Sequence, residues 1–442
     1  MRRVLAFVVV LFLAGCSGGT DPSSRAEGPA RAGPAVFGPG AAGVGDPYFP
    51  ESGNGGFDVA GYDLRLRYTP EKDLLSGTAT IKATATQDLS RFQLDLTGLA
   101  VRAVTVNGVA AASRTGGGEL VVTPAAGLRR GSAFTTVVRY AGRPVRVRGG
   151  EGWHRTSAGA YAQGGFTSAS TWFPVNGHPS DKATFALRMT VPKGMAAVSN
   201  GVPGRRTKSR GTVTWRWSVR KPMASHRAFV AIGDYRVTPR QHRGRPVVTA
   251  VPAWYPGTGA LDRTAEIADF LATRFGPYPF DAYEATAVGV PPADPGLVAR
   301  DLARQWFGNS VSVRGWQDVW LSEGFAVYAQ WLWSEHAGGP DVDESARDLY
   351  DTYPWQALPA LNPGVKGLAS QGPGVRGALT LHALQRRIGD ERFFGLLRAW
   401  AAGHAYGTVT TADFVAAAEQ ASGQDLAAFF DVWLSGRYRP TY

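Results

Sequence analysis

The spacing of apolar side chains changes near residue 249, and this change constrains the fold more than any other feature of the sequence. Between residues 57 and 249, several runs alternate apolar with polar or small side chains, which is typical of strands with one buried face. Asn107-Gly108 lies between two such runs and predicts a hairpin turn. Farther along, the spacing is helical, and it predicts helices at 261–275, 295–307, 319–335, 375–388, 391–402, 411–421 and 426–435.

These two patterns predict an α+β protein. An N-terminal antiparallel β domain (47–249) is followed by a mainly helical domain (250–442). Asp294-Pro295 predicts the start of the helix at 295, because Asp is a good capping residue and Pro fits the first helical position. A chain of 442 residues with 44% hydrophobic and 19% charged residues is long and apolar enough for two packed domains.

The first sixteen residues predict export and a lipid anchor. Two arginines precede an apolar run that is too short to span a bilayer, and Leu13-Ala14-Gly15-Cys16 is typical of a lipobox. We therefore predict a lipoprotein signal peptide (1–15), a lipidated Cys16 and a flexible linker (16–46) rich in Gly, Ala, Pro and Ser. The alternative is an ordinary signal peptide followed by an unrelated thiol. The first interpretation places the protein outside the cytoplasm, lipid-anchored to a bacterial cell membrane.

The net charge of +12 bears on the partners. It permits nucleic-acid binding, but a negatively charged envelope or lipid surface suits an exported chain better, so no nucleic-acid partner is expected. Cys16 is the only cysteine, so the chain can form neither an intramolecular disulfide nor a metal site of several thiolates.

One stretch carries the clearest motif. It runs Arg300-Asp301-Leu302-Ala303-Arg304-Gln305-Trp306-Phe307-Gly308-Asn309, and after it comes Leu321-Ser322-Glu323-Gly324-Phe325-Ala326. Eighteen residues separate Arg304 from Glu323. The stretch resembles the signature of the aminopeptidase N-like (gluzincin) zinc metallopeptidases, which read His-Glu-x-x-His-x-Gln-Trp-Phe-Gly-Asn and place a third ligand, a Glu, at the same interval.

The resemblance implies a saddle-like β domain followed by a thermolysin-like helical domain, and it assigns a position to each site residue. Arg300 and Arg304 occupy the two His ligand positions, Asp301 that of the general-base Glu, and Glu323 that of the third ligand. A guanidinium stays protonated and has no lone pair, so neither arginine can bind zinc. No cofactor is therefore expected, and Asp301 would have no metal-bound water to activate.

Other segments extend the resemblance over about residues 48–442. Trp172-Phe173-Pro174 and Lys182-Ala183-Thr184-Phe185 look like segments of the family's β domain. Gln163 lies where the family keeps a Gln that lines the substrate cleft, although a lone Gln at a strand end is more often structural. The family's amine-anchoring loop has no counterpart here, and its oxyanion-stabilising Tyr falls on Gly374. The chain stops where the thermolysin-like domain of the family ends, so no C-terminal helical domain is expected.

The preserved interval suggests what replaces the metal. We expect Arg300 or Arg304 to pair with Glu323 and to link the two helices in place of zinc. The alternative is a pair of solvated arginines opposite an apolar stripe formed by Val298, Leu302 and Trp306.

Three functions remain open at this point. The first is an inactive pseudopeptidase that binds peptides or an envelope protein through the old cleft. The second is an active zinc aminopeptidase with an altered metal site, supported by Asp301, Glu323 and the preserved frame. The third is a surface-adhesion protein that uses the basic residues Arg205, Arg206, Arg240, Arg243 and Arg245.

Overall fold

The computed structural model of the chain describes residues 36–147 and 151–441, and Phe37 and the residues after it form one compact unit. The predicted signal peptide and Cys16 lie outside the described residues, so the lipid anchor stays a prediction. Within the described part of the chain, no helix is both long and apolar enough to cross a bilayer.

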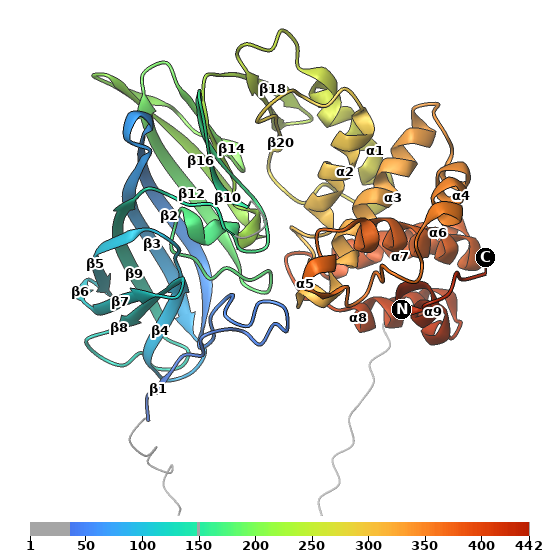
Figure 1. Cartoon of the computed structure of the whole chain (residues 1–442), viewed down its shortest axis with the longest axis horizontal. Coiled ribbons are helices and arrows are strands. Elements are labelled where there is room, and N and C mark those ends of the chain that lie inside the picture. Colours follow the sequence, from blue (N-terminus) through green and yellow to red (C-terminus); the bar gives the residue numbers. More distant parts are fainter. Residues whose placement is uncertain (1–35, 148–150, 442) are drawn as a thin grey trace, which may run out of the picture. The chain divides into compact units, whose positions relative to one another are not determined.

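Among the described residues, the N-terminal part is built on a nine-stranded sheet with the order β14-β16-β12-β2-β3-β9-β5-β6, and β15 pairs with β16 (Figure 1). Its strands are β2 (Phe57–Thr69), β3 (Leu74–Ala85), β5 (Ala100–Val106), β6 (Val109–Ala110), β9 (Ala133–Gly142), β12 (Lys182–Pro192), β14 (Val202–Pro203), β15 (Thr207–Ser209) and β16 (Thr212–Ala224). Along β12, buried side chains alternate with half-buried ones, as a sheet with one face on the core requires.

Neighbouring strands of this sheet run antiparallel, except that β2 and β12 pair in parallel. The prediction of an antiparallel β domain is therefore confirmed, with one parallel pair at its centre. A parallel pair needs a long connection between its strands, and residues 70–181 provide it. Asn107 and Gly108 both have positive φ and join β5 to β6 in the predicted hairpin turn.

Three smaller sheets contain other strands of the described residues. One contains β1 (Gly38–Pro39), β4 (Leu89–Asp95), β7 (Ala112–Gly116) and β8 (Glu119–Thr123); a second contains β10 (Gly152–Thr156), β11 (Gly159–Gln163), β13 (Ala196–Ser199) and β17 (Val230–Gly233); a third contains β18 (Tyr235–His242), β19 (Arg245–Pro252) and β20 (Tyr283–Thr286). The predicted boundary at residue 249 falls inside β19. Because β19 pairs with β20, this third sheet has strands from both sides of that boundary.

The C-terminal part is mainly helical, as predicted (Figure 1). Its helices are α1 (Thr264–Phe275), α2 (Pro295–Trp306), α3 (Trp320–His336), α4 (Val342–Thr352), α5 (Gly364–Gly367), α6 (Gly377–Ile388), α7 (Asp390–Gly403), α8 (Thr411–Ser422) and α9 (Ala427–Ser435), and β21 (Ser312–Val313) pairs with β22 (Thr408–Val409). The side chain of Asp294 accepts a hydrogen bond from the Gly296 amide, so the predicted cap of α2 is confirmed. The sequence prediction missed α4, a mostly polar helix that buries only Val342, Ala346 and Tyr350.

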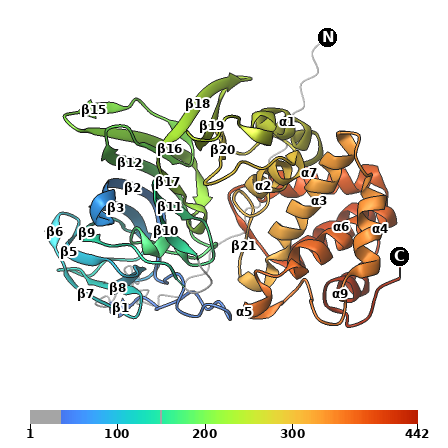
Figure 2. The ribbon, with the colours of Figure 1, turned by 45° about the horizontal axis from the view of Figure 1, so that its top comes forward.

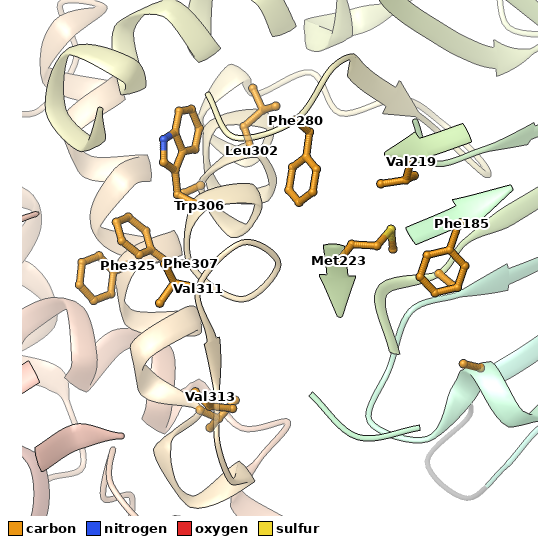
Figure 3. Close-up of a cluster of buried hydrophobic side chains, with 14 of the residues drawn as sticks. Phe185, Val219, Met223, Phe280, Leu302, Trp306, Phe307, Val311, Val313 and Phe325 are labelled. Carbon is orange, nitrogen blue, oxygen red and sulfur yellow. The ribbon is translucent and has the colours of Figure 1, made fainter. Parts of the chain in front are cut away.

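Helix α3 lies between α2 and α6 (Figure 2). The approach to α6 is close because Gly324 meets Gly377: a Cβ on Gly324 would lie 2.9 Å from backbone atoms of Gly377. Apolar side chains pack around these three helices. Figure 3 shows Leu302 and Trp306 of α2, with Phe325 of α3, on one side, and Phe185 and Met223 of the large sheet on the other.

Side chains of the β part bind backbone groups just after α2. Lys182 donates to the carbonyl of Asn309 at 3.2 Å and also to that of Ser310, and burial lowers the pKa of Lys182 to about 7. The hydroxyl of Ser312 donates to the Pro179 carbonyl at 2.9 Å. The backbone amide of Ala224, the last residue of β16, donates to Oδ1 of Asn309 at 3.2 Å, and this bond holds the following turn, η3 (Ser225–Arg227), near the C-terminal end of α2.

Candidate functional site

The site is built on facing turns of α2 and α3. Arg304 donates two hydrogen bonds to Glu323, from Nε to Oε1 at 3.1 Å and from Nη2 to Oε2 at 2.6 Å. The predicted pair between the motif helix and Glu323 is therefore confirmed, and Arg304 is the residue that forms it. Two parallel bonds from a planar guanidinium to a carboxylate are the geometry in which such pairs are strongest.

Asp301 also binds Arg304, from the same helix. Its Oδ1 accepts a hydrogen bond from Nη1 of Arg304 at 2.6 Å, while 80% of the Asp301 side chain stays exposed. Arg304 is thus bound by one sheltered and one exposed carboxylate. The alternative of solvated arginines is wrong for this residue, whose side chain is only 18% exposed.

Glu323 is held in its charged form. Burial by itself would raise the pKa of this carboxyl, but the charge and hydrogen bonds of Arg304, followed by the charges of Arg227 and Arg300, lower the pKa to about 2. Arg227 comes from η3 in the β part, and its Nη2 lies 3.8 Å from Oε1 of Glu323 and 3.4 Å from the hydroxyl of Ser322. Three guanidinium groups therefore surround one carboxylate.

Arg300 lies one turn before Arg304 and differs from it in its contacts. It forms no hydrogen bond or ion pair with any residue that the structure describes, although it is half-buried. Burial and the nearby charge of Arg304 lower the pKa of Arg300, against the opposing effect of Glu323. The π-helical turn η6 (Gly372–Arg376) lies close to the Arg300 side chain: a Cβ on Gly374 would lie 3.8 Å from Nη2 of Arg300.

Two cavities adjoin the cluster formed by Arg227, Arg300, Arg304 and Glu323. The larger, about 350 Å³, is lined by Asp301, Arg304 and apolar residues such as Val298 and Leu302. The smaller, about 230 Å³, is lined by Arg300, Glu323 and Gly374. Gly164 and Arg227 line both cavities. The two cavities therefore form two compartments of one cleft, with Arg227 between them.

Gln163 ends β11 directly before Gly164, and its backbone pairs with Gly152. The placement of its side chain lies outside what the structure describes, so its role in the cleft stays a prediction. Gly164 itself does line the cleft.

The sequence interpretation missed Arg227 and His226, which enter the site from η3. His226 lines the smaller cavity, and burial lowers the pKa of its ring well below the usual value, so the imidazole is neutral. Its Nδ1 is buried without a hydrogen-bond partner among the described residues. No motif marks these two residues, because they reach α3 only through the packing of η3 against the end of α2.

The donor set at the three ligand positions does not fit zinc. Arg300 and Arg304 have no lone pair to give, and both oxygens of Glu323 accept hydrogen bonds from Arg304. Within residues 36–147 and 151–441, no group of three or more His, Cys, Asp or Glu side chains is arranged to hold a metal ion.

Comparisons with known proteins agree with this architecture. The profile of the peptidase family M1 domain matches residues 294–360, and that of the peptidase M1 N-terminal domain matches residues 152–226. A solved structure of an M1 zinc metallopeptidase mutant from Deinococcus radiodurans, bound to a Tyr-Ser-Ala substrate, superposes with a TM-score of 0.83. It is 30% identical, and the match covers 90% of this chain and 99% of that one.

Two curated relatives are named aminopeptidase N. The protein of Lactococcus lactis subsp. lactis is 31% identical over 152 residues, which are 31% of this chain and 18% of that protein. The protein of Streptomyces lividans is 24% identical over 347 residues, or 64% of this chain and 39% of that protein. The chain thus spans well under half the length of these relatives. The fold and the site together define a gluzincin-type architecture, and the chain belongs to the peptidase family M1.

Proposed function

We propose that this chain is a member of the M1 family that holds no zinc, hydrolyses no peptide and acts by binding. The observation that carries this proposal is the two-pronged bond from Arg304 to Glu323. It takes up the carboxylate that a metal would need, and it links α2 to α3 as a metal would. Bringing a dication to this place would set it beside three guanidinium groups.

The other positions at which the family places catalytic or substrate-anchoring groups support the same proposal. Asp301 is largely exposed and bound to Arg304, and without a metal it has no water of lowered pKa to activate. Gly374 supplies no hydroxyl at the position where the family places its Tyr. Asp294 is the nearest acid before the motif helix, and its side chain caps α2.

A binding role would use the cleft that remains. The cavities of about 350 and 230 Å³ lie beside each other along α2 and offer both apolar walls and charged groups. We propose a peptide or an envelope protein as the ligand. The predicted lipid on Cys16 would hold the domain at the outer face of the bacterial cell membrane.

Metal analysis tests the proposal. The protein from Ser17 onward, which contains the whole compact unit, is incubated with excess zinc, desalted and analysed for metal. We expect less than about a tenth of an equivalent, and close to one equivalent in a control variant carrying Arg300→His, Asp301→Glu and Arg304→His. Near one equivalent in the natural sequence would overturn the proposal.

An active zinc aminopeptidase with an altered site is the second candidate. The family membership and the retained Glu323 and Asp301 favour it, and measurable cleavage of aminopeptidase substrates by the zinc-treated natural protein would establish it. The adhesion alternative is weaker, because Arg240 and Arg243 have acidic partners in Asp262 and Asp269 and Arg206 stacks on Trp215.

A further inference from the structure

Two arginines of the same helix differ in one respect that points to a ligand. Arg304 donates to two carboxylates, whereas Arg300, one turn earlier, donates to none of the residues that the structure describes. A guanidinium has five N–H donors, and polar groups withdrawn from bulk water are nearly always hydrogen-bonded. Arg300 is half-buried and lines the smaller cavity, so the missing acceptor belongs in that cavity.

A second guanidinium faces the same space. Arg227 lines the smaller cavity from the opposite, β part of the unit, and its Nε is buried without an acceptor among the described residues. Its Nη2 has only longer contacts, at 3.4 Å to Ser322 and 3.8 Å to Glu323. Two guanidinium groups with unfilled hydrogen-bonding capacity, Arg300 and Arg227, therefore line this cavity from separate elements.

The charges favour a ligand with a single negative charge. Two carboxylates, Glu151 and Glu323, line the cavity together with Arg227 and Arg300. Arg304 adds a third positive charge behind Glu323, while its other partner, Asp301, is exposed to screening by water. The sheltered groups thus sum to one excess positive charge, which a monovalent carboxylate balances and a phosphate dianion exceeds. A planar carboxylate also matches the fork of a guanidinium.

The shape of the cleft favours the end of a chain. A cavity of about 230 Å³ is smaller than most sites that enclose a whole small molecule, and Phe166, Trp316 and Leu368 give it an apolar wall. It adjoins the cavity of about 350 Å³ along Gly164 and Arg227. A ligand whose charged end reaches Arg300 can therefore extend past Gly164 into the larger compartment.

We propose that the smaller cavity is a receptor for the C-terminal carboxylate of a peptide, bound by Arg300 with Arg227 opposite. The inference rests on the proposed function, because it needs a cleft without metal. It names the end of the peptide that is recognised, which is the opposite of the amine end that an aminopeptidase anchors.

Calorimetric titration of the protein from Ser17 onward tests it with capped peptides. The probes are acetyl-trialanine with a free C-terminus, the same peptide as its C-terminal amide, trialanine amide with a free amine, and sodium acetate. We expect the free acid to bind at least about tenfold more tightly than either amide, and acetate to bind more weakly than the peptide acid.

Variants test whether Arg300 binds the carboxylate. Arg300→Gln should weaken binding of the peptide acid about tenfold or more and leave binding of the amide unchanged. Arg300→Lys keeps the charge but not the planar pair of donors, so its affinity for the peptide acid should be intermediate. Arg398→Gln on α7, an exposed arginine away from both cavities, is the matched control and should change nothing. The comparison of acid with amide in the natural protein needs no variant, so it stands even if one fails to fold.

Equal affinity for acid and amide, preference for the free amine, or no binding at millimolar concentration would overturn the inference. Acetate binding as tightly as the peptide acid would assign the site to small carboxylic acids and overturn the peptide part. Metal analysis of the same sample separates the two failures. A zinc-free protein that ignores the carboxylate sinks this inference alone, whereas a zinc-loaded one sinks the proposed function.

Discussion

Removing the charge of Glu323 probes the cluster most directly. The pKa of this carboxyl falls from the ordinary 4.5 to about 2, a difference of about 2.5, and each pKa unit corresponds to about 1.4 kcal/mol. Because the Glu323 side chain is 22% exposed, part of this free energy is screened by water, and we expect Glu323→Gln to lower the free energy of unfolding by about 2–3 kcal/mol at pH 7.

The sign of the pH dependence follows from the direction of the shift. A carboxyl whose pKa is depressed in the folded state stabilises the protein above its unfolded pKa, and this contribution is lost as the pH falls toward the folded value. The difference between the natural protein and Glu323→Gln should therefore be full above pH 5 and shrink steadily between about pH 4.5 and 2.

A double-mutant cycle assigns the partner. Arg304→Gln leaves Glu323 with Arg227 at 3.8 Å, so its cost should stay below the roughly 3–5 kcal/mol typical of a fully buried pair, and its coupling to Glu323→Gln should be about 1.5–2 kcal/mol. Arg300→Gln is the matched control, with a coupling to Glu323 below about 0.5 kcal/mol. Urea unfolding followed by tryptophan fluorescence measures all of these. Equal coupling for the two arginines would refute the reasoning.

Two further predictions concern other parts of the unit. Burial, with the charge of Asp95, raises the pKa of Glu119 from 4.5 to about 8, so the stability that this group contributes at low pH is lost as the pH rises from about 4.5 to about 8. Glu119→Gln should therefore stabilise the protein by roughly 1–2 kcal/mol at pH 9, after allowance for solvent screening, and by nothing at pH 4. A pH-independent effect in urea unfolding would contradict this. Gly324→Ala should lower the free energy of unfolding by about 1–3 kcal/mol, because the new Cβ would lie 2.9 Å from backbone atoms of Gly377. Gly395→Ala on α7, where the space is open, is the control and should raise it by about 0.5–1 kcal/mol. Thermal unfolding that ranks the two variants the other way would show that the α3–α6 contact is loose.

Much of the fold could be predicted because it follows from local patterns. Period-two alternation marks β16, and the Asp294 cap with its following proline marks the start of α2. Helix α4 was missed because most of its residues are polar, although its three buried residues, Val342, Ala346 and Tyr350, recur at every fourth position. The predicted boundary at residue 249 falls inside β19, since strand pairing with β20 depends on a segment more than thirty residues later in the chain.

The sequence by itself determined the chemistry that the motif positions offer. Two arginines cannot ligate a metal wherever they lie, and this conclusion depends only on side-chain type. The expectation that one of them meets Glu323 came from the resemblance, because the eighteen-residue interval between Arg304 and Glu323 is the one that separates two ligands of a single metal in the family.

Only the tertiary structure decided which arginine is paired with Glu323 and which has no partner among the described residues. The choice depends on how α2 is rotated against α3, and on the arrival of Arg227 from η3, some seventy residues earlier in the chain. Helix periodicity places Arg300 and Arg304 on one face, but a guanidinium reaches a carboxylate only over a few ångströms. Distances of that size are set by side-chain packing between the two parts of the unit, which no local pattern in the sequence records.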